Sequence, residues 1–295
     1  MSSDLDIAKC YKFVKELTLQ AGKIIKCAFE SEKVVYKKGD WDLVTDIDYK
    51  IEKMFVDSLS MKFPDHKIIA EETVAAMQEM PELTDEPTWF LDPIDGTINF
   101  VHTFPQNCIS IGLTVCKEPV LGIIYNPVTS ELYTAIKGEG AFLNGKRIHT
   151  SKVTELKKAL QVIEPKIMLI VYKKNKNIFL GRIDAIVEAT RATRSMGSAA
   201  MSMAYVARGA IDCVQIDGLQ CWDIVAGIVI VREAGGTVME TKNGVYDIMK
   251  PNTIAAANEI LACEMSKLII ETDLNIQKKQ LENQSQCKKE TNHVK

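Results

Sequence analysis

The sequence lacks the features by which the common classes of catalytic protein are recognised. Its eight cysteines form no Cys-x-x-Cys pair and its four histidines are widely spaced, so neither a redox dithiol nor a zinc site is indicated. It has no Gly-x-Ser-x-Gly elbow of a serine hydrolase and no complete Gly-x-x-x-x-Gly-Lys-Ser/Thr loop of a nucleotide-binding protein. We predict reduced, mostly buried cysteines, and carboxylates remain as the candidates for chemistry.

Basic charge and long apolar runs are also scarce. The 295 residues have a formal net charge of -3, which gives no electrostatic reason to bind nucleic acid or a membrane surface. No run approaches the roughly 20 apolar residues of a membrane span, and the segment from Met1 to Lys9 is polar rather than signal-like. We therefore expect a cytoplasmic protein with no nucleic-acid or membrane partner.

Hydrophobic periodicity predicts a mixture of helices and strands. Apolar residues recur at helical spacing from Ile7 to Ala28, and the Asn144–Gly145 pair between two short apolar runs is typical of a tight hairpin turn. We expect further helices at about 49–61, 183–189, 198–207, 224–234 and 259–270. We expect strands at about 67–70, 89–91, 109–115, 122–125, 131–135, 141–143, 146–148, 160–163, 168–172, 211–214, 237–239 and 254–257.

The chain has no clear linker and no repeat. We expect two closely packed halves, 1–150 and 151–270, which meet near residue 150. After residue 270 the sequence is polar and nearly free of large apolar side chains. Such a segment buries too little surface to offset its ordering entropy, so 271–295 is predicted to be a flexible tail.

Acidic residues stand where predicted apolar elements end. Glu71 follows one short strand, Asp92 and Asp95 follow another, and Asp223 lies near the start of a helix, while Asp42 and Asp48 flank the start of the second helix. In the segment 92–97, Pro93 fixes its own φ angle and Gly96 permits a sharp bend. Two carboxylates and the Ile94 carbonyl can then present three oxygens to a hard cation such as magnesium.

Each of these motifs taken alone has a simpler interpretation. Asp-Pro-x-Asp-Gly is common turn chemistry, Asp223 is a typical residue for a helix N-terminus, and Glu71–Glu72 is typical of a solvated loop. Asp42 and Asp48 are typical helix-capping residues. Their combination in a chain without other chemistry favours a metal site, and the turn at Gly96–Asn99 can point its N–H groups at a phosphate.

The same segments resemble the inositol monophosphatase family over roughly residues 5–270. The resemblance implies an α+β fold, an alternating αβαβα layered sandwich of the sugar-phosphatase type, and a homodimer. The segments that carry it are Asp42–Thr45 with Asp48, Ala70–Glu72, Trp89–His102, Gly138–Gly145, Arg194–Ala200 and Cys221–Gly227.

The resemblance also implies roles for individual residues. The implied Mg²⁺ ligands are Glu71, Asp92, the Ile94 carbonyl, Asp95 and Asp223. Glu71, Thr97 and Asp48 are implied to position the attacking water, with no covalent enzyme intermediate, and lithium is implied to inhibit. The implied substrate-binding residues are Glu71, Ile94, Asp95, Gly96, Thr97, Gly197, Ser198, Ala199, Ile216 and Asp223. The residues 1–150 would then carry the metal-binding signature, and 151–270 would complete the active site.

The predicted function is therefore Mg²⁺-dependent hydrolysis of inositol monophosphate. Three positions depart from the family pattern: Ile98 replaces a threonine, Ile216 replaces a glutamate that bonds inositol hydroxyls, and 164–168 replaces a Gly- and Ser-containing loop. Asp217, next to Ile216, is an alternative carboxylate for the sugar. The alternatives are a related phosphatase for another polyol or nucleotide monophosphate, and a catalytically dead binding or scaffold relative.

Overall fold

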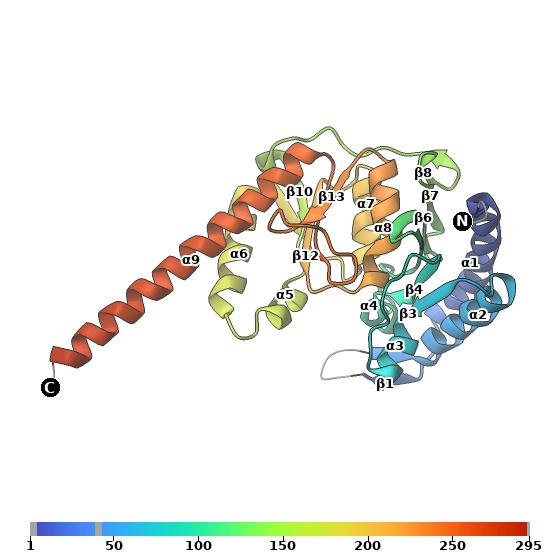
Figure 1. Ribbon diagram of the computed structural model, residues 1–295, viewed down its shortest axis with the longest axis horizontal. Helices are drawn as coiled ribbons and strands as arrows, with labels where there is room; N and C mark the ends of the chain where they lie inside the picture. Colours follow the sequence, from blue (N-terminus) through green and yellow to red (C-terminus); the bar gives the residue numbers. More distant parts are fainter. Residues whose placement is uncertain (1–4, 39–42, 294–295) are drawn as a thin grey trace.

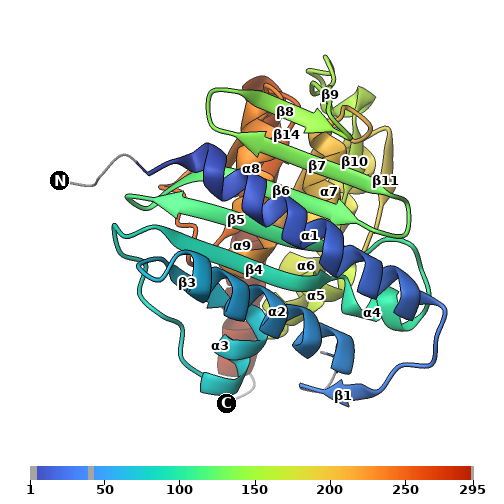
Figure 2. The same cartoon turned by 90° about the vertical axis from the view of Figure 1, so that its right-hand side faces the viewer.

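Helices and sheets alternate in five layers in the computed structural model, which describes residues 5–38 and 43–293 (Figure 1). Helices α1 (Ile7–Phe29) and α2 (Asp46–Lys62) cover the outer face of a seven-stranded sheet, as Figure 2 shows. Helices α7 (Ala199–Ala207) and α8 (Cys221–Glu233) fill the space between this sheet and a five-stranded one. Helices α6 (Lys176–Ala189) and α9 (Glu259–His293) lie outside the second sheet. The predicted α+β, αβαβα layered sandwich is confirmed.

The larger sheet has the strand order β3-β4-β5-β6-β7-β8-β9. Strands β3 and β4 are parallel and the remaining pairs are antiparallel. The predicted hairpin turn joins β8 to β9, where Asn144 and Gly145 have φ angles of 49° and 78°. The strands are β3 (Lys67–Ala70), β4 (Thr88–Asp95), β5 (Cys108–Val115), β6 (Glu118–Asn126), β7 (Glu131–Ile136), β8 (Gly140–Leu143) and β9 (Lys146–Arg147).

The smaller sheet has the order β11-β10-β12-β14-β13. Strand β10 runs parallel to β11 and β12, whereas β14 is antiparallel to both of its neighbours. A separate pair, β1 (Val35–Lys37) and β2 (Leu43–Thr45), is antiparallel. The five strands are β10 (Leu160–Val162), β11 (Ala192–Arg194), β12 (Cys213–Asp217), β13 (Thr237–Glu240) and β14 (Asn252–Ala256).

Two glycines let the helix that carries Asp223 approach the larger sheet. Gly112 on β5 and Gly122 on β6 are paired across the sheet. A Cβ atom on Gly112 would lie 2.9 Å from the Ala226 nitrogen, and one on Gly122 would lie 2.3 Å from the Ala226 carbonyl oxygen. Only a residue without a side chain permits this contact. The backbone of α8 therefore lies against the sheet, with its first turn beside the end of β4.

Several short helices were not predicted, and one replaces a predicted strand. The apolar run expected as a strand at 168–172 belongs to α5 (Pro165–Val171), so that prediction is wrong. Short apolar runs do not distinguish helix from strand, and Pro165 at the first helical turn favours the helix. The other short helices are α3 (Glu71–Met77), α4 (Thr97–Val101) and the 3₁₀ turn η1 (Leu156–Lys158).

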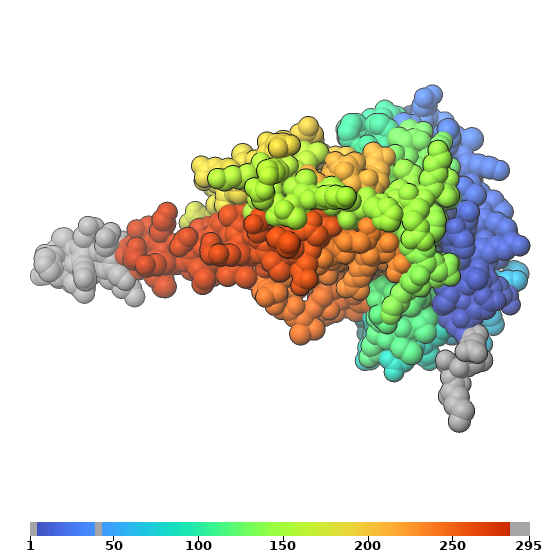
Figure 3. All heavy atoms as spheres, turned by 90° about the horizontal axis from the view of Figure 1, so that it is seen from above, coloured from blue at the N-terminus to red at the C-terminus, as the bar shows by residue number. Residues whose placement is uncertain are grey.

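The last helix is longer than expected and reaches His293, within the segment 271–295 that the sequence predicts to be a flexible tail. The part of helix α9 that is drawn in red projects from the rest of the molecule (Figures 1 and 3). Long-range contacts anchor its middle: Asp273 is 4% exposed and makes two 2.7 Å bonds with Arg182 on α6. Gly181 on α6 has no side chain, which lets Ile276 of α9 pack closely against α6. The Lys, Gln and Glu residues beyond this anchor have high helix propensity.

Within the described part of the chain, no helix is long and apolar enough to cross a membrane.

Candidate metal and active site

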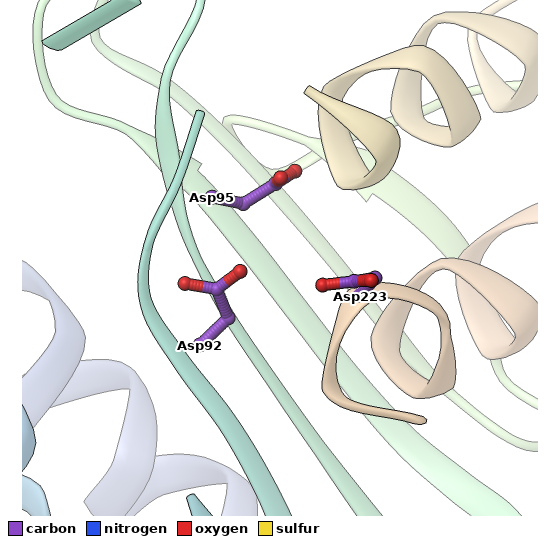
Figure 4. Close-up of side chains that lie close together, drawn as sticks. All are labelled: Asp92, Asp95 and Asp223. Atoms are coloured by element: carbon purple, nitrogen blue, oxygen red, sulfur yellow. The ribbon is translucent and has the colours of Figure 1, made fainter. Parts of the chain in front are cut away.

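Three aspartates from two layers meet at one point. Asp92 and Asp95 end strand β4, and Asp223 lies in the first turn of α8 (Figure 4). Each offers a carboxylate oxygen, and these oxygens lie within 4.8 Å of one another. Asp92 is 3% exposed and Asp95 is 8% exposed. Three carboxylates this close, two of them buried and one half-buried, repel one another unless a proton or a cation compensates their charge.

A β-bulge brings the two aspartates of β4 to the same side. Asp92 is paired with Ser110 and Asp95 with Cys108, so three steps on β4 match two steps on β5. Residues three apart in a regular strand point to opposite faces, and the extra residue of a bulge removes that opposition. The Ile94 nitrogen donates to an Asp92 oxygen at 3.0 Å. The Asp-Pro-x-Asp-Gly segment therefore forms a local turn, and the same turn brings its two carboxylates together.

Asp95 joins the cluster to the predicted phosphate-binding loop. Its Oδ2 accepts hydrogen bonds from Ser198 Oγ at 2.6 Å and from the Ala200 nitrogen at 2.7 Å. Burial raises the pKa of Asp95 to about 6, although these bonds oppose the shift. Gly96 has a φ of 87°, and a Cβ atom there would lie 3.1 Å from the Gly197 carbonyl oxygen. The segments 96–97 and 197–199 thus lie side by side.

Asp48 and Thr97 form a second pair beside the aspartates. Asp48 is buried in the first turn of α2, where a capping box with Thr45 holds its carboxylate. The Thr97 hydroxyl lies 3.3 Å from Asp48 Oδ1 and 3.0 Å from the Ile94 carbonyl oxygen. Burial raises the pKa of Asp48 to about 6. Asp42, the other acidic residue predicted to flank this helix, lies outside the described residues.

Glu71 begins helix α3 and stands next to Asp92. Burial raises the pKa of Asp92 well above its usual value, and the charges of Glu71, Asp95 and Asp223 raise it further. The Lys38 ammonium lies 2.8 Å from Glu71 Oε1. Sequence reasoning missed Lys38, because one lysine among 36 basic residues carries no local signal.

A buried glutamate that sequence reasoning also missed supports the substrate loop. Glu164 is 5% exposed and its Oε1 accepts from the nitrogens of Met196 and Gly197 at 2.7 and 2.9 Å. Its Oε2 accepts from the Ser195 hydroxyl at 2.8 Å. The altered segment 164–168 thus keeps a carboxylate that fixes the loop, while Met168 turns into the core.

Ile216 and Asp217 point to opposite faces of β12. Ile216 is 1% exposed and packs in the apolar cluster between the sheets. Asp217 accepts bonds from Arg182 at 2.6 Å and Thr241 at 2.6 Å, and also from the Tyr172 hydroxyl. A one-residue shift in a strand reverses every side chain. The idea that Asp217 substitutes for the missing sugar-binding glutamate is therefore wrong.

The donor set fits a hard divalent cation. Every candidate ligand presents oxygen, from carboxylates and the Ile94 carbonyl, and such cations prefer oxygen ligands. The raised pKa values of Asp92 and Asp95 reflect a buried excess of negative charge that a cation would balance. Glu72 adds a buried carboxylate oxygen, Oε2, without a partner among the described residues.

Known proteins match this chain in sequence and fold over nearly its whole length. The sequence model of the inositol monophosphatase family matches residues 6–273. Inositol monophosphatase 1 of Homo sapiens is 40% identical over 268 residues, which cover 88% of this chain and 94% of that protein. The solved IMPase of Thermotoga maritima has a TM-score of 0.78 and 32% identity, covering 91% and 99% of the two chains.

A staphylococcal IMPase-II is similar as well, and its structure has been solved in two separate complexes, each with a different ligand. Its complex with inositol monophosphate has a TM-score of 0.75 and 28% identity, covering 91% of this chain and 97% of that one. Its complex with 2′AMP has a TM-score of 0.77 and 29% identity, with coverages of 92% and 99%. From its sequence, fold and clustered carboxylates, this chain belongs to the inositol monophosphatase family.

Proposed function

We propose that this protein is a Mg²⁺-dependent phosphatase that hydrolyses inositol monophosphate to inositol and phosphate. The observation that carries the proposal is the cluster of Asp92, Asp95 and Asp223 with the Asp48–Thr97 pair beside it. Family membership supports the reaction class, which is phosphoric monoester hydrolysis. It also supports a homodimer, a cytoplasmic location and inhibition by lithium.

Asp92, Asp95, Asp223, Glu71 and the Ile94 carbonyl would hold the cation. When bound, Mg²⁺ lowers the pKa of a water and stabilises negative charge on the phosphate and the leaving oxygen. The protein's own contribution is orientation: buried elements fix these oxygens before substrate arrives. Such preorganisation removes part of the entropic barrier to attack.

Asp48, Thr97 and Glu71 are proposed to position the attacking water. The Thr97 hydroxyl has one hydrogen, which it can direct to Asp48 or to the Ile94 carbonyl. Its oxygen lone pairs then remain to accept a hydrogen bond from water. Glu71 is proposed to accept from the same water. Water attack in line with the leaving oxygen needs no nucleophilic side chain, which is consistent with the absence of a serine elbow.

The phosphate and sugar are proposed to lie against the two segments that meet at Asp95. Gly96 and Thr97 line one side, and Gly197, Ser198 and Ala199 line the other. Position 216 is proposed to lie beside the sugar, although the Ile216 side chain itself packs into the apolar cluster. Isoleucine offers no hydrogen-bond acceptor to a hydroxyl, so the protein should discriminate less strongly among phosphate monoesters than relatives with glutamate there.

A second candidate is a phosphatase for another monoester, such as a nucleotide monophosphate. The apolar Ile216 and the binding of 2′AMP by the staphylococcal relative favour it. A catalytically dead scaffold is less favoured, because unpaired clustered carboxylates destabilise a fold that makes no use of them.

The test is phosphate release from a panel of inositol, sugar and nucleotide monophosphates, with Mg²⁺ and with EDTA. We expect Mg²⁺-dependent turnover with inositol 1-phosphate among the best substrates. Faster turnover of 2′AMP than of every inositol phosphate would favour the second candidate. No phosphate release from any monoester at saturating Mg²⁺ would contradict both.

A further inference from the structure

The carboxylate of Glu52 holds the start of helix α3 from a neighbouring helix. Glu52 lies on α2 and is 5% exposed. Its Oε2 accepts from the Glu72 nitrogen at 2.7 Å, and its Oε1 accepts from the Thr73 nitrogen at 2.7 Å and the Thr73 hydroxyl at 2.6 Å. The N-cap residue of α3 is Ala70, which has no side-chain acceptor. Glu52 therefore satisfies first-turn donors that the local sequence leaves open.

Glu71 immediately precedes the two residues that Glu52 holds. Helix α3 has seven residues and ends at Met77, and the C-cap residue Gln78 has a left-handed conformation. A helix this short has little stability of its own, so its position depends on contacts with neighbouring elements. A shift of its first turn would carry Glu71 away from Asp92 and the other aspartates.

Helix α2 carries Asp48 one turn before Glu52. Residues four apart lie on the same face of a helix, and both side chains are buried. Asp48 contacts Thr97, while Glu52 contacts the backbone next to Glu71. One face of α2 thus contacts Thr97 and the first turn of α3. These two segments carry the groups proposed to position the attacking water.

We infer that Glu52 is a positioning residue that sets the orientation of Glu71 toward the cation and the attacking water. The inference rests on the proposed function, since that function gives Glu71 its role. Glu52 itself touches neither the aspartate cluster nor the substrate segments. A group that orients the residue bound to a metal changes metal affinity or activity by about 10–100-fold when it is removed.

The first experiment measures Mn²⁺ affinity by EPR titration in wild type, Glu52→Gln and Glu52→Asp. Glutamine keeps the shape but turns an amide toward backbone N–H donors, and aspartate keeps the charge but is one methylene too short. We expect both to weaken Mn²⁺ binding about tenfold or more, and to lower kcat. Aspartate with wild-type affinity would show that charge alone matters, and would overturn the inference.

Two controls separate orientation from general stability. Asp57→Asn removes a carboxylate on the exposed side of α2, where it pairs with Lys53, and should leave Mn²⁺ affinity unchanged. Thr73→Val removes one hydroxyl donor to Glu52 at an exposed position, so it should fold even if the Glu52 variants do not. We expect several-fold weaker Mn²⁺ binding in Thr73→Val. Unchanged affinity in Thr73→Val would overturn the inference.

Wild type and Glu71→Gln test the proposed function independently of the role inferred for Glu52. If wild type neither binds Mn²⁺ nor releases phosphate, the proposed function fails. If wild type does both and Glu71→Gln loses both, while the Glu52 variants match wild type, the proposed function stands and the positioning role of Glu52 fails.

Discussion

The ammonium group of Lys38 lies 2.8 Å from Glu71 and 2.5 Å from Glu72, in two ion pairs that are largely shielded from water. Burial alone would lower the pKa of Lys38, but the two glutamates raise it above its usual value, so the lysine stays charged. It supplies positive charge to a cluster of carboxylates. A divalent cation that binds Glu71 must therefore share this carboxylate with Lys38 or displace it.

Replacing this ammonium should increase the dependence of stability on metal. In Lys38→Met, the metal-free protein is expected to melt at a lower temperature, because Glu71 and Glu72 lose a buried partner. Added Mg²⁺ should raise the melting temperature of the variant more than that of wild type. The control is Lys67→Met, which removes an exposed pair with Glu86. An equal Mg²⁺-induced shift in Lys38→Met and wild type would contradict this prediction.

Asp92→Asn should separate catalysis from folding. Asparagine keeps the shape but removes one of the clustered charges, so kcat should fall by orders of magnitude at saturating Mg²⁺. The metal-free variant should melt at a higher temperature than metal-free wild type, because repulsion from Glu71, Asp95 and Asp223 is relieved. Near-normal turnover would show that Asp92 is not a metal ligand. Differential scanning fluorimetry with and without EDTA measures the second effect.

Ile216→Glu tests whether this position reads the sugar. A charged acceptor bonded to a hydroxyl contributes about 1.5–3 kcal/mol, and 1.4 kcal/mol corresponds to about tenfold in affinity. We expect kcat/KM for inositol 1-phosphate to rise about tenfold relative to that for 4-nitrophenyl phosphate. The free energy of unfolding should fall, because Ile216 is buried in an apolar cluster.

The matched control for this position is Ile216→Met, which stays apolar and should leave the ratio of the two kcat/KM values unchanged. Equal effects of Ile216→Glu on both substrates, or a loss on inositol 1-phosphate alone, would show that residue 216 does not contact the sugar.

The Arg182–Asp273 pair predicts a pH dependence of stability far from the active site. Burial alone would raise the pKa of Asp273, but hydrogen bonds from Arg182 and Lys242 hold it below its usual 3.8. Its stabilising contribution is therefore complete above the unfolded-state pKa, and it is lost as pH falls through the lower folded-state value. Asp273→Asn should lower the free energy of unfolding by about 3 kcal/mol at pH 7.

Urea denaturation between about pH 3 and pH 7 measures this difference. The gap between wild type and Asp273→Asn should be constant above about pH 5 and shrink at lower pH, since Asp273 becomes protonated in both states. Asp57→Asn, which breaks an exposed pair, should cost only about 0.5 kcal/mol. A gap that widens as pH falls would contradict the ion-pair explanation.

The aspartates that meet in the structure could be singled out from local patterns in the sequence. Asp92, Asp95 and Asp223 each stand at the end of a buried element, and that position is visible from hydrophobic periodicity. The residues that support them were missed, because their bonds join distant parts of the chain: Glu52 holds Thr73, and Glu164 holds Gly197, which is 33 positions away. Periodicity reports which face is buried, but it does not report which donor a buried carboxylate receives.

The strand expected at 168–172 and the extent of the last helix have different explanations. A short apolar run does not distinguish a helix from a strand, and Pro165 favours the helix that the structure shows. The last helix is held by the bond between Arg182 and Asp273, which spans 91 positions, and no local window of sequence contains both partners.

The order of synthesis gives the middle helical layer a further consequence. The strands of the larger sheet are complete at Arg147, but the helices that bury its inner face end only at Glu233. At roughly 5–20 residues per second, a ribosome needs on the order of ten seconds to cover this interval. During that time Phe90, Ile124 and Tyr133, on the inner face of the sheet, are not yet covered by the middle helices. Asp95 also lacks the hydrogen bonds that it accepts from Ser198 and Ala200. The nascent chain is therefore most exposed to aggregation before α8 emerges. Substitutions of the buried apolar residues of α8, which leave Asp223 in place, should reduce the yield of folded protein more than the activity of each molecule that folds.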